Sequence, residues 1–341
     1  MVVNKDLWEQ EARGKARLRR IIFSILVVFV LVLVGCWFVI TEPVLSVARL
    51  EPIAGVETSR LESIVRTLSN SPRDFSHIEN LDKAAAFIAN ELRATGATVT
   101  EQEYRVTSAN GSGTYRNVIG TLGPDTGDVI VVGAHYDACG PYPGADDNAS
   151  GIAGLLELAR LLARATLSTR VQFVAYSLEE PPFFRSSNMG SAQHASFLQQ
   201  NGTKVRAMIS LEMIGYFSDD STSQAYPAPF LRPFYPSSGN FIAVVGNLRS
   251  ISLVRSVKKA MMAGSAQPVY SINAPGWIPG IDFSDHLNYW NNGFPAVMIT
   301  DTAFYRNKAY HTDHDTPERL DYHKMAQVIQ GIYQAIINLE K

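Results

Sequence analysis

Cysteine is rare in this sequence, and its rarity excludes one common way of stabilising a fold. The 341 residues contain two cysteines, and one of them, Cys36, lies inside a long apolar run. Cys139 is the only cysteine left for the rest of the chain, so that part cannot form an internal disulfide. Its stability must come from a hydrophobic core, which about 280 residues are enough to supply.

A strong charge of one sign is also missing. The 30 Lys and Arg residues nearly balance the 32 Asp and Glu residues, which leaves a net charge of -2. This balance gives no electrostatic reason to expect nucleic acid as a partner. Internal repeats are absent too, and the one biased stretch is a Pro- and Ser-rich segment at residues 219–239. We expect that segment to be a surface loop near the functional site.

No charged residue interrupts the run from Ile21 to Ile40. As a helix this run would be roughly 30 Å long, the thickness of the hydrocarbon core of a bilayer, so it predicts a membrane-spanning helix. The basic residues on its N-terminal side are Lys5, Arg13, Lys15, Arg17, Arg19 and Arg20. The positive-inside rule therefore places residues 1–20 in the cytoplasm as a basic tail. After a linker at residues 41–56, a large domain at residues 57–341 would lie outside, in the periplasm or the extracellular space.

Two alternatives to an uncleaved anchor remain open for this run. Leu33-Val34-Gly35-Cys36 resembles a bacterial lipobox, in which Cys36 would carry the lipid. The run stays apolar through Trp37–Ile40, however, where a mature lipoprotein normally turns polar. The second alternative is a helix buried in the domain. The uncleaved anchor is favoured, and the lipobox-like run with its short basic tail is typical of a bacterial protein.

Beyond residue 56, strand-like and helical patterns alternate. The expected strands are Thr98–Val106, Arg116–Thr121, Val129–Ala134, Arg170–Tyr176, Val205–Leu211, Phe241–Val245 and Ala296–Thr300. The expected helices are Glu57–Leu68, Leu81–Leu92, Gly151–Ala163, Gly190–Gln200, Ile251–Ala263 and Tyr322–Leu339. Such alternation predicts an α/β fold with a mixed, largely parallel central sheet and helices on both faces.

Five short segments carry histidines and carboxylates of the kinds that bind metal ions. They are His135-Tyr136-Asp137, Gly144–Gly151 (GADDNASG), Glu179-Glu180, Glu212 and His311–Thr316 (HTDHDT). Three of the segments directly follow an expected strand, and ligands in such sheets bind beyond the carboxyl ends of the strands. We therefore expect all five segments to converge at one edge of the sheet.

Imidazole and carboxylate groups are ligands that zinc favours, and two zinc ions about 3.5 Å apart need a bridging carboxylate with further ligands on each side. His135 would bind one ion, and Asp137 would hold the second ring nitrogen of His135. Asp147, in a loop flanked by glycines, is the natural bridge. Glu212 and His311 would supply the remaining terminal ligands, one for each ion.

Glu179 and Glu180 are adjacent, so an extended chain would point them in opposite directions. A turn at the end of the strand can bring both to one site, where one carboxylate binds metal and the other stays free. A free carboxylate beside a metal site is what a general base for hydrolysis requires.

Together with Ser284-Asp285-His286, these motifs resemble those of the M28 family of zinc metallopeptidases, the co-catalytic aminopeptidases. The resemblance extends from about residue 60 to the C-terminus, and the motifs follow the family order. It implies an aminopeptidase-like fold, two Zn²⁺ ions, a peptide substrate and a cis peptide bond between Asp147 and Asn148. The metal ligands that it implies are His135, Asp147, Glu180, Glu212 and His311. It also makes Glu179 the general base, and Asp285 and His286 would support the site.

The sequence departs from the family at two positions. Many members have aspartate where Glu212 stands, although the longer side chain can still bind metal. Several similar aminopeptidases have a tyrosine that polarises the substrate carbonyl three residues before Ser-Asp-His, and here that position is Ile281. Tyr270, Trp277 and Tyr305 are candidates to replace that tyrosine.

The other candidate ligands are less favoured. Cys139 and His314 lie close to proposed ligands in the sequence, but the ligand set is complete without them. The remaining histidines, His77, His194 and His323, have no nearby motif and are expected to be surface residues.

The expected function is that of a membrane-anchored di-zinc exopeptidase, and an aminopeptidase is favoured. One alternative is a glutaminyl cyclase, which has a similar fold but retains one zinc ion and lacks the full ligand set. The other is a receptor-like ectodomain with a decayed site. Retention of both His135 and His311 favours hydrolysis, and the intact Glu179 argues against decay.

Overall fold

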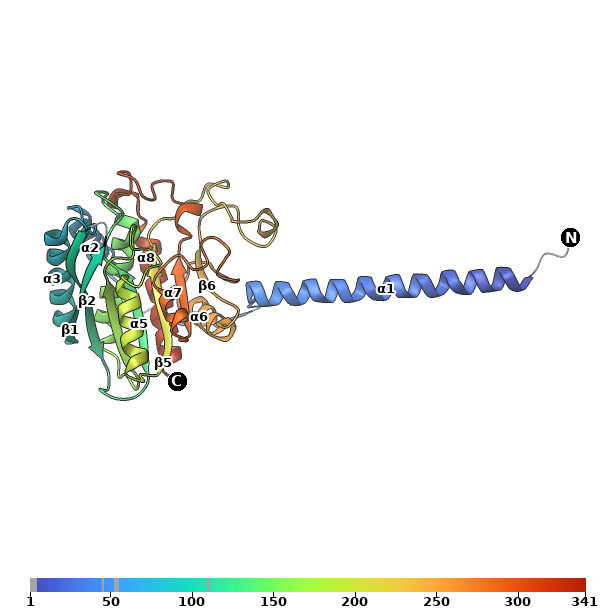
Figure 1. Cartoon of the computed structure of the whole chain (residues 1–341), viewed down its shortest axis with the longest axis horizontal. Coiled ribbons are helices and arrows are strands. Elements are labelled where there is room, and N and C mark those ends of the chain that lie inside the picture. The colour runs from blue at the N-terminus through green and yellow to red at the C-terminus, as the bar shows by residue number, and fades with distance from the viewer. Residues whose placement is uncertain (1–4, 45, 52–54, 109–110) are drawn as a thin grey trace.

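A computed structural model describes residues 5–44, 46–51, 55–108 and 111–341. Within them, eight strands form one sheet in the order β1-β2-β4-β3-β5-β8-β6-β7 (Figure 1). Their bounds are β1 Thr98–Ser108, β2 Gly111–Leu122, β3 Val129–His135, β4 Arg170–Tyr176, β5 Val205–Glu212, β6 Ile242–Gly246, β7 Val269–Asn273 and β8 Ala296–Thr300. The neighbours β4, β3, β5 and β8 run parallel, whereas β1, β2 and β6 introduce antiparallel pairs. The predicted mixed, largely parallel sheet is confirmed.

Helices cover both faces of the sheet. Their bounds are α2 Thr58–Ser69, α3 Ile78–Ala94, α4 Gly151–Leu162, α5 Gly190–Gln200, α6 Ile251–Gly264, α7 His286–Asn291 and α8 Tyr322–Leu339. Alternate residues of β3 show the two faces, because Ile130 and Val132 pack in the cluster that includes α2, α4, α6 and α8. Val129 and Val131 pack on the other side with residues of α5 and α7. All six helices expected after residue 56 are present, and the sequence pattern missed α7 and β7.

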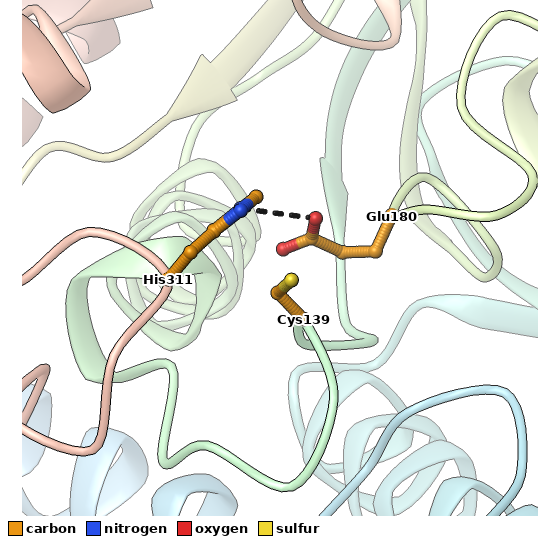
Figure 2. A group of neighbouring side chains, drawn as sticks. All are labelled: Cys139, Glu180 and His311. Carbon is orange, nitrogen blue, oxygen red and sulfur yellow. Dashed lines mark ion pairs between the residues drawn. The ribbon is translucent and has the colours of Figure 1, made fainter.

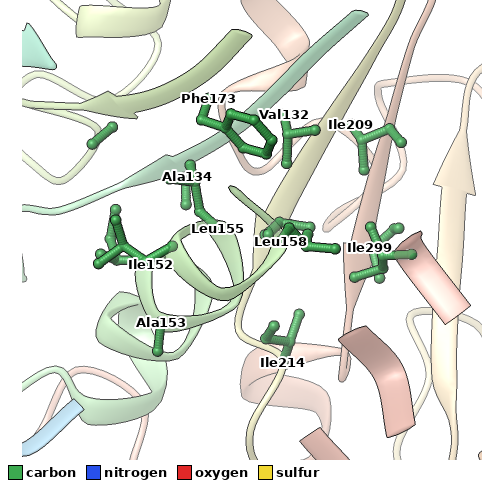
Figure 3. Packing of buried hydrophobic residues seen from close by; sticks show 14 of the residues in the cluster. Val132, Ala134, Ile152, Ala153, Leu155, Leu158, Phe173, Ile209, Ile214 and Ile299 are labelled. Atoms are coloured by element: carbon green, nitrogen blue, oxygen red, sulfur yellow. The ribbon is translucent and has the colours of Figure 1, made fainter. Parts of the chain in front are cut away.

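The core holds α4 in place over the centre of the sheet. Figure 3 shows Ile152, Leu155 and Leu158 of α4 against strand residues that include Val132 and Phe173. Almost the whole surface of α4 is buried. Because α4 begins at Gly151, immediately after the Asp147 loop, its packing also fixes one end of that loop.

The N-terminal helix α1, Lys5–Thr41, projects away from the domain (Figure 1). Its most apolar window is wholly outside the protein core, so the alternative of a buried helix is wrong. By length and composition α1 is a candidate membrane span. The helix is longer than the apolar run, because it continues into the basic segment before Ile21.

One histidine differs from expectation. His77 and His323 are exposed, as expected for surface residues, but His194 is buried. It lies on the face of α5 that packs on the sheet with Ala195 and Leu198, and its Nδ1 is 2.6 Å from the hydroxyl of Tyr289. Burial lowers the pKa of His194 to about 3, so this ring is a neutral part of the core.

Candidate metal centre

Three adjacent strands deliver the first site residues to one edge of the sheet. His135 is the last residue of β3 and Glu212 the last residue of β5, the parallel neighbour of β3. Glu179 and Glu180 follow β4, which pairs with β3 on its other side. These three segments therefore meet at the carboxyl ends of their strands, as expected.

The chain turns after β4 so that both glutamates face the site. Leu178 has a φ of 62°, a left-handed conformation that non-glycine residues seldom adopt. The Asp137 carboxylate accepts hydrogen bonds from the backbone amides of Glu179 (3.2 Å) and Glu180 (3.0 Å). Nδ1 of His135 is hydrogen-bonded to the backbone carbonyl oxygen of Asp137 at 3.2 Å, and the Asp137 carboxylate, which the sequence predicted as the partner, lies slightly farther away at 3.5 Å. Asp137 therefore positions both the histidine and the glutamate pair.

Long-range hydrogen bonds hold the Asp147 loop, and the Asp147–Asn148 peptide bond in it is cis, as the family resemblance implied. The Asp315 carboxylate accepts hydrogen bonds from the backbone amides of Asp146 (3.1 Å) and Asp147 (3.0 Å). Buried Arg73 donates to the carbonyl oxygens of Tyr136, Pro143 and Gly144. Nothing in the sequence around Arg73 indicated this role.

Asp147 lies between two groups of potential ligands. Its Oδ1 is 3.3 Å from Nε2 of His135, and that nitrogen is 3.4 Å from Oε2 of Glu212. Its Oδ2 is 3.1 Å from Nε2 of His311, and that nitrogen is 3.1 Å from Oε2 of Glu180. The arrangement is two sets of one imidazole and one glutamate that share a single aspartate.

Two further side chains lie beside these sets. Oε2 of Glu179 is 4.0 Å from Nε2 of His135, farther than the carboxylates of Asp147 and Glu212, although the potential ligand atoms of His135, Glu179 and Glu180 also lie within 4.8 Å of one another. Cys139 faces Glu180 and His311 (Figure 2), and the potential ligand atoms of these three residues lie within 4.8 Å of one another. His314 is exposed, and its Nδ1 is 3.6 Å from Oδ1 of Asp313.

Sequence and structure comparisons agree with this arrangement. Residues 117–336 match the profile of Peptidase family M28. The chain belongs to peptidase family M28. It is 47% identical to the uncharacterized protein YfbL of Escherichia coli (strain K12), over 94% of this chain and 99% of that protein. It is 24% identical to leucine aminopeptidase 1 of Ajellomyces capsulatus (strain G186AR), over 83% of this chain and 71% of that protein.

Solved structures share the fold at low sequence identity. BSAP, a zinc aminopeptidase from Bacillus subtilis, aligns with a TM-score of 0.65 and 16% identity, over 83% of this chain and 95% of that one. A glutaminyl cyclase from Fimbriiglobus ruber aligns with a TM-score of 0.64 and 20% identity, over 86% of this chain and 98% of that one. The aminopeptidase-like fold is thus shared by enzymes of two kinds.

Buried negative charge in this M28 domain exceeds what its own cations balance. Burial raises the pKa of Glu180 to about 8 and that of Asp285 to about 7, and it raises the pKa of Glu179 well above the usual range. Burial would lower the pKa of His135, but the carboxylates of Glu212, Asp137 and Asp147 outweigh it and raise that pKa. Divalent cations would balance this charge.

The polar atoms left without partners fit metal ions. Nε2 of His135, Nε2 of His311 and Oε1 of Glu180 are buried and make no hydrogen bond of acceptable geometry, although carboxylate oxygens lie 3.1 to 3.4 Å from the two nitrogens. Imidazole nitrogen and carboxylate oxygen are the ligands of catalytic zinc sites, and a shared carboxylate is typical of sites with two metals. The two sets around Asp147 therefore fit a pair of zinc ions.

Within the Ser-Asp-His motif, Ser284 contacts a proposed ligand, and the supporting roles of Asp285 and His286 stay predictions. The Ser284 hydroxyl donates to Oε2 of Glu212 at 2.8 Å and thereby fixes that carboxylate. Asp285 is fully buried, and Nε2 of His286 is 2.8 Å from the carbonyl oxygen of Ile281. Ser284 was not singled out from the sequence, although its place in the motif was a usable signal.

An apolar cavity of about 100 Å³ adjoins the Glu212 side of the site. The segment 219–239 lines it with Tyr226, Leu231 and Tyr235, which confirms that this segment is a loop near the site. Tyr310, also in the wall, stacks on the imidazole of His311 with ring centroids 3.7 Å apart. Sequence reasoning missed Tyr310, although it immediately precedes a proposed ligand.

Proposed function

We propose that this chain is a membrane-anchored aminopeptidase that uses two zinc ions. The observation that carries the proposal is the position of Asp147, whose two carboxylate oxygens each face one imidazole–glutamate set. The ligands of one ion would be His135, Glu212 and Asp147, and those of the other His311, Glu180 and Asp147. Residues 57–341 would form the zinc peptidase domain.

Zinc ions at this position would supply Lewis acidity, which lowers the pKa of a water molecule and polarises a carbonyl group. Glu179 lies next to the His135 set without belonging to its closest contacts, so its carboxylate can take the proton of the attacking water. The same carboxylate can then hand that proton to the leaving amine. Asp137 acts through Glu179 and Glu180, because it holds the backbone amides of both residues.

Peptides with free and blocked N-termini test the assignment. Full-length protein in detergent should release the first residue from a free peptide and leave the N-acetylated form intact. A strong zinc chelator should abolish the release, and added zinc should restore it. Ammonia release from a peptide that begins with glutamine, without cleavage, would instead establish the cyclase alternative. A zinc-loaded protein that turns over neither substrate would indicate a receptor-like ectodomain.

The candidates for polarising the substrate carbonyl differ in where their side chains lie. Trp277 is 81% exposed, and the Tyr305 hydroxyl already donates to the carbonyl oxygen of Pro279. Tyr270, on the edge strand β7, packs its ring against Phe241 at a centroid distance of 5.2 Å. Tyr310 stacks its ring on the proposed ligand His311, and none of these three side chains stacks on a proposed ligand.

We therefore propose Tyr310 as the group that donates a hydrogen bond to the substrate carbonyl. Tyr310→Phe keeps the ring that stacks on His311, so zinc content should not change. The kcat should fall by roughly 10²-fold, the lower end of the loss for one oxyanion donor, with KM nearly unchanged. Steady-state kinetics with metal analysis measures both effects. Tyr305→Phe is the matched control, and equal rates for the two variants would refute the assignment.

For the orientation in the membrane, we propose that α1 spans the bilayer with residues 1–20 in the cytoplasm. The support is the one-sided basic charge before the apolar run and the exposure of that run in the structure. Protease added to intact cells or spheroplasts should digest the domain and spare the N-terminal tail. A mature protein that begins at lipid-modified Cys36 would establish the lipoprotein alternative.

A further inference from the structure

The outer end of α1 is fixed to the catalytic domain by side chains that satisfy its last carbonyl groups. The final four carbonyls of a helix have no partners within the helix. Here Asn273 donates to the carbonyl of Val39 at 2.9 Å, and Ser271 and Lys258 both donate to the carbonyl of Thr41 at 2.8 Å. The domain is therefore held directly against the end of the helix.

An apolar groove separates α1 from the domain just before this junction. Its volume is about 570 Å³. The helix contributes one face, made of Val32, Gly35, Cys36, Val39 and Ile40. The domain wall includes Phe230, Leu231, Leu248, Ile272 and Asn273. Of the lining residues that the structure describes, only Asn273 and Cys36 have a polar side-chain group, and the others are apolar.

The groove extends along α1 far enough that the domain side of the groove should lie beside the membrane. Val32 precedes Ile40 by eight residues, ~12 Å along the axis at 1.5 Å per residue. A bilayer that covers the apolar run from Ile21 to Ile40 therefore also reaches the part of the domain that faces Val32. In Figure 1 the segment 219–239, coloured yellow to gold, lies on the side of the domain nearest α1.

Large apolar side chains are exposed at or close to this groove. Phe230 (64% exposed) and Leu248 (51%) line it, and Phe234 (50%) and Trp277 (81%) lie within three residues in the sequence of the lining residues Leu231 and Ile278. We term these four residues the rim. Arg232 lies two positions from both Phe230 and Phe234, Arg249 directly follows Leu248, and both arginines are exposed. Aromatic and aliphatic side chains flanked by arginine are typical of protein surfaces that enter the boundary between lipid headgroups and acyl chains.

We propose that the rim is immersed in the outer leaflet of the bilayer that α1 spans, and that acyl chains fill the groove. The inference uses the proposed membrane span but does not depend on the peptidase activity. It bears on that activity because Leu231 and Ile272 line both the groove and the cavity at Glu212. If the proposed activity holds, the site lies directly behind the membrane surface, where it would meet peptides that are themselves lodged in the bilayer.

Tryptophan quenching by lipids brominated in their acyl chains tests the immersion. The full chain has four tryptophans, so Trp8→Phe, Trp37→Phe and Trp290→Phe leave Trp277 as the reporter. In liposomes, bromolipid should quench Trp277 at least about twofold more than a tryptophan on a face turned to water, because the rim would lie at the acyl boundary. Circular dichroism checks that each variant folds.

The matched control places the reporter on another exposed apolar position. Phe197 is 53% exposed and lies on α5, away from α1 in Figure 1. Phe197→Trp in a background without the four native tryptophans should show little quenching. Leu248→Trp in the same background is a second rim reporter and should match Trp277.

A chain that keeps only Trp37 reports on α1 itself. Strong quenching of Trp37 without quenching of either rim reporter would overturn the immersion and leave the span intact. Absence of quenching at Trp37 would overturn the span and the immersion together. A blue-shifted Trp277 that bromolipid does not quench would show that protein and not lipid covers the rim, which also overturns the proposal. Peptidase assays on the same liposomes report the activity separately.

Discussion

Glu179→Gln should lower kcat by roughly two to four orders of magnitude while both zinc ions stay bound. Glutamine keeps the size of the side chain and its hydrogen-bonding reach but cannot accept a proton at neutral pH. Oε2 of Glu179 lies 4.0 Å from Nε2 of His135, outside the closest contacts of either ligand set, so metal content should not depend on its charge. Rapid kinetics and elemental analysis of the same preparation would measure both quantities.

Glu180→Gln provides the contrast for this experiment. Glu180 is adjacent in the sequence and equally buried, but its Oε2 is 3.1 Å from Nε2 of His311. The variant should lose zinc as well as activity, because an amide oxygen is a weaker ligand than a carboxylate. Near-native turnover of Glu179→Gln, or zinc loss equal to that of Glu180→Gln, would rule out the proposed division of roles.

The sheet was predictable because its central strands are covered on both faces. Runs such as Val129–Val132 are short, apolar and β-branched, and they occur in the structure as β3 with every residue buried. The edge strand β7 was missed because Tyr270 and Ile272 are only partly buried and its polar residues interrupt the pattern. Those polar residues, Ser271 and Asn273, hold the end of α1, a purpose that strand periodicity does not reveal.

The proposed ligands were predictable from the sequence, but most of their supports were not. A metal ligand can be recognised by its residue type and by its position directly after a strand, as for His135 and Glu212. A support can be any donor that folding brings near. Arg73 reaches the carbonyls around the Asp147 loop from 63 or more positions away in the sequence, and no local pattern marks it. Tyr310 likewise has a position next to His311 but no distinguishing motif.

The Asp147 loop was only partly predictable from the sequence. The run GADDNASG suggested a tight loop, and the resemblance to M28 enzymes suggested a bridging aspartate. Neither indicated that Asp315 would hold the loop through the amides of Asp146 and Asp147. That contact joins residues 168 and 169 positions apart, so it depends on the completed sheet rather than on local sequence.

Asp147→Asn should have the largest effect on the metal centre, because Asp147 is the only residue shared by both ligand sets. Its Oδ1 faces His135 and its Oδ2 faces His311, so a side-chain amide presents a nitrogen to one of the two ions whichever way it turns. Zinc content after gel filtration should fall below about one ion per chain, and kcat/KM should drop by at least roughly 10⁴-fold with zinc in the buffer.

Two matched variants test whether Asp147 binds both ions or only one. Glu212→Gln alters only the His135 set, so this variant should retain about one zinc ion per chain. His314→Ala, in the same segment as His311 but exposed, should retain both ions and full activity. If Asp147→Asn kept as much zinc as Glu212→Gln, Asp147 would serve one set only. The two imidazole–glutamate sets would then be independent sites, and a single catalytic ion would have to explain the chemistry, as in the cyclase alternative.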